Sequence, residues 1–264
     1  MIFVLVYIAY AVLGIIAGIL GGLLGIGGGV ITVPCLLYLF HWLGYPQPYV
    51  MQMAIATSLA AMIFTTTSAT WAHNKRKAVL WDILKKMMPG LVIGSIVGAI
   101  IALWISGVLL EIFFGISLCL LAFRFYREKG TPSDRAKLPS KPILSLLSGC
   151  IGALSNILGI GGGSMTVPML TYFKVPDKKA IGTSASATLV TSILGSISYL
   201  IFGWGDAPAP DNLGLINLPS FIIIGVMTFI FAPYGVKLTH QISPKKVRKI
   251  FAFVLAITGL SLII

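Results

Sequence analysis

Charged side chains are scarce in this 264-residue chain. Asp, Glu, Lys and Arg make up 10% of the residues, only 7 of them acidic, whereas 57% of the residues are hydrophobic. A soluble domain carries about 25% charged residues, which cover the surface that faces water. The shortage excludes a soluble globular protein, a disordered chain and a coiled coil. It favours a polytopic membrane protein, in which most residues face lipid or one another.

The residue types that build metal and catalytic sites are also few. Three cysteines (Cys35, Cys119 and Cys150) lie in apolar stretches at unrelated spacings, and the three histidines lie far apart near segment ends. Neither a zinc site nor a disulfide framework is expected from this pattern. No charged residue falls clearly at the middle of an apolar segment, where an intramembrane hydrolase or a carboxylate proton relay would need one. We therefore expect no enzyme activity, no cofactor and no metal.

The 19 basic residues give a net charge of +12, but they are confined to four short segments: residues 75–86, 124–141, 174–179 and 237–249. Short loops rich in Lys and Arg lie on the cytoplasmic side of a membrane protein. The charge is therefore a topology signal and does not indicate nucleic-acid binding. The first residues, MIFVLVYIAYAVLG, lack a basic start and a small-residue cleavage site, so we expect a membrane segment there and not a cleaved signal peptide.

The chain contains two copies of one unit. Residues 25–38 read GIGGGVITVPCLLY and residues 159–172 read GIGGGSMTVPMLTY, so 10 of 14 positions recur 134 residues later. A second, shorter echo pairs Thr57-Ser58 with Thr183-Ser184. Such self-similarity indicates an internal duplication. We predict an N-terminal membrane repeat (1–126), a polar cytoplasmic linker (127–141) and a C-terminal membrane repeat (142–264).

Each half opens with a long glycine-rich stretch, residues 1–40 and 142–173, and three simpler apolar segments follow each one: 53–72, 87–104 and 107–123, then 180–202, 220–236 and 250–264. Counting four crossings per half gives parallel repeats and divides the basic residues 11 to 8 between the two sides. If instead each glycine-rich stretch starts and ends on one side, all the basic residues become cytoplasmic and both termini extracytoplasmic. We prefer this second arrangement: an all-α polytopic protein of two four-segment repeats, inverted relative to each other, each opening with a glycine-broken helix pair that is re-entrant or discontinuous.

The glycine runs are poor helix interiors, because Gly costs about 1 kcal/mol relative to Ala in a helix. Pro34 and Pro168 weaken the turns that follow. Within lipid, broken backbone is tolerated only where protein or a water-lined cavity satisfies it, so both breaks should lie deep, near the repeat interface. A helix that starts after each break directs free N–H groups and partial positive charge at the cavity, which suits an anion.

The candidate substrate-binding residues are the glycines and prolines of the two motifs with the hydroxyl and amide side chains near them: Gly25, Gly27, Gly28, Gly29, Thr32, Pro34, Thr57, Ser58, Asn156, Gly159, Gly161, Gly162, Gly163, Ser164, Thr166, Pro168, Thr183 and Ser184. Two alternatives stay open. The glycines could serve only close helix packing, as Gly90, Gly94 and Gly98 are expected to do. The paired Thr and Ser hydroxyls could bond to carbonyls of their own helices.

The doubled GIGGGxxxVP motif, the paired Ala/Thr/Ser echoes and the basic central linker resemble the TauE/SafE family of sulfite and organosulfonate permeases. The resemblance spans the whole chain, and the family's glycine motifs correspond to Gly25–Gly29 and Gly159–Gly163 with Pro34 and Pro168. It implies a bacterial or archaeal inner-membrane protein that carries small sulfur-containing anions, often outward. The conventional eight-helix description of the family conflicts with the charge count above.

Our leading hypothesis is a secondary transporter for anions such as sulfite, thiosulfate or organosulfonates, working by alternating access. Across an inside-negative membrane, moving one negative charge outward gains about 2.3 kcal/mol per 100 mV, so export needs no coupling ion, whereas import would need H⁺ or Na⁺. Two rivals remain. An anion channel would share the same breaks without an alternating gate. A membrane scaffold or assembly factor would use the glycines for packing and would carry no flux.

Overall fold

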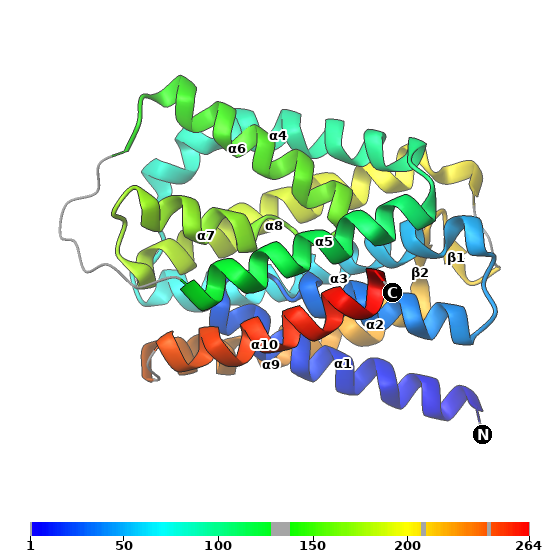
Figure 1. The fold of residues 1–264 in the computed structure, drawn as a ribbon. Coiled ribbons are helices and arrows are strands. Elements are labelled where there is room, and N and C mark those ends of the chain that lie inside the picture. The colour runs from blue at the N-terminus through cyan, green and yellow to red at the C-terminus, as the bar shows by residue number, and fades with distance from the viewer. Residues whose placement is uncertain (1, 128–137, 207–209, 242–243, 264) are drawn as a thin grey trace.

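The structure, a computed structural model, describes residues 2–127, 138–206, 210–241 and 244–263. These residues form ten α-helices that run side by side along one axis (Figure 1). The helices are α1 (Ile2–Leu24), α2 (Gly29–Trp42), α3 (Gln47–Lys75), α4 (Trp81–Trp104), α5 (Gly107–Arg127), α6 (Lys141–Leu158), α7 (Gly163–Tyr172), α8 (Asp177–Phe202), α9 (Leu218–Gln241) and α10 (Pro244–Ile263).

This architecture confirms the all-α polytopic class. Seven of the described helices are long and apolar enough to cross a membrane, and α2 is a shorter apolar helix. Each glycine-rich opening stretch forms two helices, α1 with α2 and α6 with α7, and each simpler segment forms one helix. The linker predicted at 127–141 falls largely on residues 128–137, which lie outside the described part of the chain, so the division into repeats and linker stays a prediction.

The helix directions agree with the second of the two arrangements weighed above, and the inversion of the repeats stays a prediction. In Figure 1, α1 starts at the end of the bundle that carries both chain termini, and α2 returns to that end. The pair α6 and α7 starts and finishes at the opposite end. All the described basic residues lie at that opposite end. They are in or beside the last turns of α3, α5, α7 and α9 and the first turns of α4, α6, α8 and α10.

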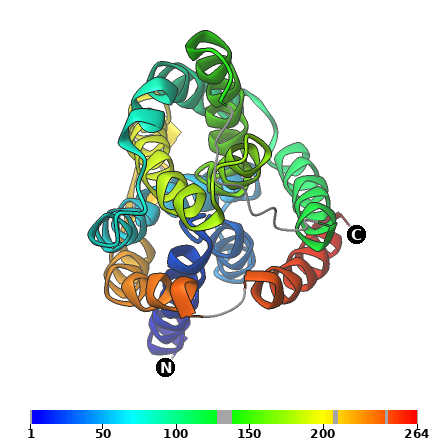
Figure 2. The same cartoon turned by 90° about the vertical axis from the view of Figure 1, so that its left-hand side faces the viewer.

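The two halves are interleaved. The most extensive helix contacts join one half to the other: α4 packs on α6, α1 on α9, and α5 on α10. Figure 2, which views the bundle from the basic end, shows α5 and α10 together at one flank. Gly90, Gly94 and Gly98 allow α4 to approach α6, since a Cβ on any of them would collide with an α6 backbone carbonyl. Their predicted packing role is confirmed.

Exposed tryptophans mark the two ends of the bundle. Trp42 and Trp104 are the last residues of α2 and α4, Trp81 is the first residue of α4, and all three side chains are exposed. Tryptophan is enriched where a membrane meets water, because its ring is apolar and its N–H can stay hydrated. The positions of these side chains therefore agree with helices that cross a bilayer along the bundle axis.

One element was not anticipated from the sequence. Between α8 and α9 the chain forms a short 3₁₀ helix (Trp204–Asp206) and a two-stranded hairpin of β1 (Asn212–Leu213) and β2 (Ile216–Asn217). The corresponding connection in the first half, between α3 and α4, has only residues 76–80. The hairpin lies at the end that carries the termini (Figure 1) and brings the buried Asn217 to the start of α9.

Candidate functional site

The two glycine breaks have the same backbone conformation. Gly25 and Gly159 both have φ of 68°, and the glycine pairs two and three positions later agree closely, at 76° against 73° and 89° against 85°. Positive φ is unfavourable for residues that carry a Cβ and free for glycine. The duplicated glycines are therefore required by the left-handed backbone that ends one helix and starts the next.

The breaks cross each other in the middle of the bundle, where residues 21–30 and 155–164 are all buried. Gly29, the first residue of α2, lies against the second break, since a Cβ placed on it would be 2.5 Å from the Gly159 carbonyl oxygen. Gly163, the first residue of α7, lies in the same way against the carbonyl of Gly25. The N-termini of α2 and α7 therefore begin beside each other and leave in opposite directions.

Hydroxyl groups from α3 and α8 satisfy the carbonyls that the breaks expose. Ser58 Oγ donates to the Gly159 carbonyl at 3.3 Å, and Thr191 Oγ1 donates to the Gly161 carbonyl at 2.6 Å. Ser184 Oγ lies within reach of two carbonyls, at 3.1 Å from Gly25 and 3.2 Å from Gly163. Both serines of the paired echoes therefore contact the breaks directly.

The threonines of the same echoes have another role. Thr57 Oγ1 accepts a hydrogen bond from the backbone N–H of Asn217 at 3.0 Å, just before α9. Thr183 Oγ1 accepts from the backbone N–H of Leu80 at 2.9 Å, just before α4. Each threonine thus ties its helix to the start of a helix in the other half, a contact that the sequence did not predict.

The remaining candidates lie close to the breaks. Pro34 and Pro168 are buried inside α2 and α7, which continue through them. Thr32 Oγ1 donates to the Gly28 carbonyl at 3.1 Å. Asn156 Nδ2 donates to the carbonyls of Ser95 at 3.0 Å and Thr191 at 3.3 Å, so this amide faces α4 and α8.

Several buried polar atoms around the second break have no hydrogen-bond partner among the described residues: Ser155 Oγ, Asn156 Oδ1, Ser164 Oγ, Thr166 Oγ1 and Thr188 Oγ1. A buried polar group that lacks a partner costs about 1–3 kcal/mol. Such a group in a native protein calls for an explanation, and a bound water or solute is one. The cluster therefore makes the second break a candidate binding site.

Two residues between the breaks were missed by sequence reasoning. Met62 of α3 and Thr188 of α8 both lie against Gly27 and Gly161: the Thr188 methyl carbon would be 2.9 Å and 2.7 Å from a Cβ on these glycines. The spacing of 126 residues that relates Ser58 to Ser184 also relates Met62 to Thr188. That spacing was the available signal, but the two residue types differ and show no echo.

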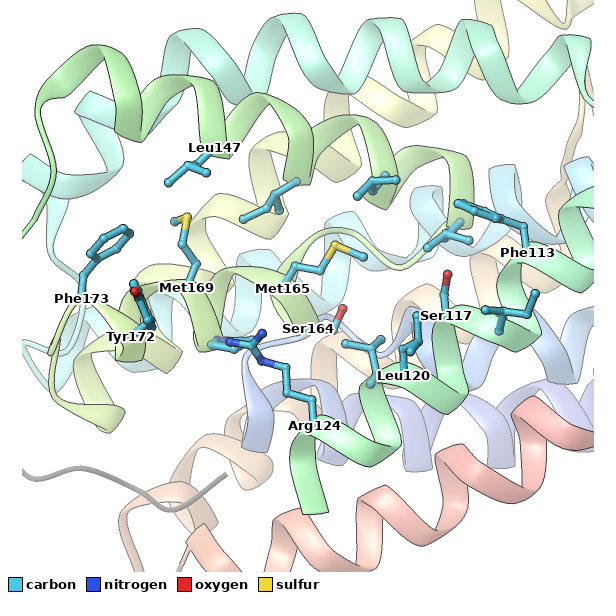
Figure 3. Close-up of a pocket in the computed structure, with 16 residues that line it drawn as sticks. Phe113, Ser117, Leu120, Arg124, Leu147, Ser164, Met165, Met169, Tyr172 and Phe173 are labelled. Carbon is cyan, nitrogen blue, oxygen red and sulfur yellow. The ribbon is translucent and has the colours of Figure 1, made fainter. Parts of the chain in front are cut away.

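A cavity of about 590 Å³ reaches the second break from the basic side, between α5, α6 and α7. Figure 3 shows Ser164 at the start of α7 and Arg124 of α5 extending towards α7. Ser117 adds a hydroxyl, and most other lining groups are aliphatic or aromatic, among them Met165 and Pro168. The cavity can hold a solute of modest size beside the first turn of α7.

No Asp, Glu, Lys or Arg is fully buried in the part of the chain whose side chains are described. The crossing therefore offers neutral hydroxyls, one amide and two helix N-termini. An N-terminus carries about half a positive charge, so such a site favours an anion without a buried basic residue.

Comparison with known proteins assigns the chain to a family. The family model described as "Sulfite exporter TauE/SafE" matches residues 10–262. A "Probable membrane transporter protein" of Haemophilus influenzae is 30% identical over 253 residues, which cover 94% of this chain and 95% of that protein. Another of Methanocaldococcus jannaschii is 31% identical over 256 residues, which cover 96% and 94%.

A third relative, the "Probable membrane transporter protein YunE" of Bacillus subtilis, is 31% identical over 218 residues, which cover 75% of this chain and 79% of that protein. No solved structure matches the chain. The family match covers nearly the whole sequence, and these relatives align over most of their own length. The chain therefore belongs to the sulfite exporter TauE/SafE family of membrane transporters.

Proposed function

We propose that the protein is a secondary transporter that exports small sulfur-containing anions, such as sulfite, thiosulfate or organosulfonates, by alternating access. One observation carries the proposal: two helix N-termini meet at the centre of the bundle among neutral hydrogen-bond donors, and no Asp, Glu, Lys or Arg is fully buried among the residues whose side chains are described. Helix ends of this kind attract an anion. Transporters built from broken helices bind their substrates near the middle of the membrane in the same way.

The orientation follows from the charge distribution. The described basic residues lie at one end of the bundle, so this end faces the cytoplasm by the positive-inside rule and both termini face outward across the cell's inner membrane. Outward movement of an anion then gains about 2.3 kcal/mol per charge per 100 mV of inside-negative potential. Export needs no H⁺ or Na⁺ gradient under these conditions.

The interleaved halves support alternating access. At the end with the termini, Asn217 bonds to Thr57 of α3 through its N–H and to Tyr45 through its side chain at 3.0 Å, so polar contacts join the halves there. At the basic end, the cavity beside α5 reaches Ser164. This geometry corresponds to a substrate path from the cytoplasm to the crossing, and rocking of one half against the other would reverse the access.

Reconstituted vesicles test the proposal. Purified protein in liposomes is loaded in turn with sulfite, thiosulfate and taurine, and release is followed under a potassium diffusion potential of either sign. We expect saturable release of at least one of these solutes, and for an anion a rate that rises when the loaded compartment is negative and does not depend on Na⁺ or on a pH gradient. Release no faster than from protein-free liposomes, for all three solutes and both signs, would refute transport of this class.

A further inference from the structure

We propose that the transported anion is bound at the second break alone, by the first turn of α7 and the hydroxyls of Ser155, Ser164 and Thr188. The inference rests on the proposed function and makes it more specific. It assigns ligand roles to Ser155 and Thr188, and it gives the two duplicated breaks different tasks.

The three hydroxyls belong to residues that lie at or against the start of α7. Ser155 Oγ lies 3.0 Å from the position of a Cβ on Gly162, the residue that precedes α7. Thr188 Oγ1 lies 2.9 Å from the position of a Cβ on Gly163, the first residue of the helix. Ser164 is the second residue of α7 and lines the cavity. All three side chains are fully buried, and none of the three oxygens has a hydrogen-bond partner among the described residues.

The unpartnered hydroxyls are an observation separate from the helix terminus, and both indicate an anion. The hydroxyl groups that donate to the exposed carbonyls belong to other residues, among them Ser184 and Thr191. The O–H groups of Ser155, Ser164 and Thr188 therefore stay available to donate to a ligand. An oxyanion or sulfonate accepts several such hydrogen bonds at once, and hydrogen bonds to an ionised group are the stronger kind.

The first break lacks these groups even though its backbone is the same. The positions equivalent to Ser155 and Ser164, 134 residues earlier, are Gly21 and Val30, and the position equivalent to Thr188 is Met62. None of these three side chains can donate a hydrogen bond. The left-handed turn is therefore present in both halves, whereas donors at these three positions are present only in the second.

Transport kinetics of a single methyl-for-hydroxyl exchange test the assignment. Thr188→Val keeps the shape of the side chain, including the methyl group that packs on Gly27 and Gly161, and removes the hydroxyl. For whichever of sulfite, thiosulfate or taurine the wild type carries, we expect the KM to rise about 10-fold or more, the loss expected for one hydrogen bond to a charged group. Thr188→Ser, which restores the hydroxyl, should return the KM towards the wild-type value.

The matched control is Thr228→Val in α9. Thr228 is equally buried, but its hydroxyl already donates to the Gly225 carbonyl at 2.9 Å. We expect its KM to stay at the wild-type value. Ser164→Ala serves as a second variant if Thr188→Val does not fold, and it should raise the KM in the same direction.

Four outcomes would overturn the assignment. An unchanged KM in Thr188→Val, with wild-type transport intact, would exclude Thr188 as a ligand and leave the proposed function standing. An equal rise in Thr228→Val would show a general effect on the bundle. A changed Na⁺ dependence at constant anion KM would make the hydroxyl a cation ligand. A wild-type protein that carries none of the three solutes would fail the proposed function itself, and this site with it.

Discussion

Ser58 and Ser184 occupy equivalent positions in the two halves, and each hydroxyl donates to a glycine carbonyl in the break of the opposite half. The acceptors are the carbonyls of Gly159 and Gly25, which are themselves equivalent, at 3.3 Å and 3.1 Å. The exchange is reciprocal, so neither break has its carbonyls satisfied by its own half alone. The two halves therefore depend on each other for the stability of the crossing, because an unsatisfied carbonyl is costly within a membrane.

Removal of the Ser184 hydroxyl should destabilise the protein more than removal of its counterpart. Ser184→Ala removes one O–H that lies within reach of the carbonyls of both Gly25 and Gly163, whereas the O–H lost in Ser58→Ala reaches only the Gly159 carbonyl. A buried acceptor left unpaired costs about 1–3 kcal/mol. We expect the apparent melting temperature in detergent to fall for both variants, and further for Ser184→Ala.

Ser196→Ala is the control for this comparison, because its hydroxyl bonds only to the Ser192 carbonyl of its own helix, at 2.7 Å. That carbonyl belongs to the helix backbone ladder, so the melting temperature should change little. Equal shifts in Ser184→Ala and Ser196→Ala would contradict the role assigned to Ser184.

A methyl group should be tolerated far less well at Gly161, where the two breaks cross, than at Gly44, in an open turn with the same backbone conformation. Gly161 and Gly44 have similar φ values, 73° and 77°, so alanine at either position pays the left-handed strain of about 1–2 kcal/mol. A Cβ on Gly44 meets nothing within 4 Å, whereas one on Gly161 collides with the Met62 methyl and lies 2.7 Å from the Thr188 methyl. We expect Gly161→Ala to lower the melting temperature more and to abolish flux, with flux intact in Gly44→Ala. Similar behaviour of the two variants would show that strain alone requires glycine there.

Much of the fold could be predicted from the sequence because the duplication is explicit in it. The glycine runs predicted two helix breaks, and the confinement of basic residues to four segments predicted a common end for them. Both inferences rest on strong physical requirements: a left-handed turn needs glycine, and a charged side chain within lipid costs free energy that it avoids in water. Positions such as Gly25 and Lys75 can therefore be interpreted without knowledge of their neighbours.

The hydrogen-bond partners and neighbours of the side chains where the two breaks cross could not be predicted in the same way. Whether a hydroxyl has a partner depends on which carbonyl comes near it in space. Thr32 and Thr166 occupy equivalent motif positions, yet Thr32 donates to Gly28 and Thr166 has no partner among the described residues. Met62 and Thr188 share neither residue type nor motif, so their common position appears only when the halves are packed together. The hairpin that carries Asn217 has no counterpart in the first half and left no repeat signal.

Reporter fusions should place the C-terminus outside the cytoplasm. Both termini lie at the end opposite the basic residues, and the positive-inside rule keeps the basic end in the cytoplasm. We expect alkaline phosphatase fused after Ile264 to be active and a fluorescent protein fused there to stay dark. The same reporters inserted into the linker at 127–141 should give the reverse result. A fluorescent C-terminal fusion would contradict the inverted arrangement.

Truncation of the Met62 side chain should let anions leak through the protein between its two halves. Its Cε lies against Gly27 and Gly161, and its Sδ is 2.7 Å from the position of a Cβ on Gly29, so one flexible side chain fills the space between the breaks. Met62→Ala removes that filling and should lower stability by about 2–5 kcal/mol, as other buried Met→Ala changes do. Met87→Ala, at a fully buried methionine of α4 that packs in a separate apolar cluster, should have a comparable cost. Only Met62→Ala should also raise anion leakage from vesicles, because only the cavity left by Met62 would join the starts of α2 and α7. Equal leakage from both variants would show that the Met62 side chain does not separate the two helix starts.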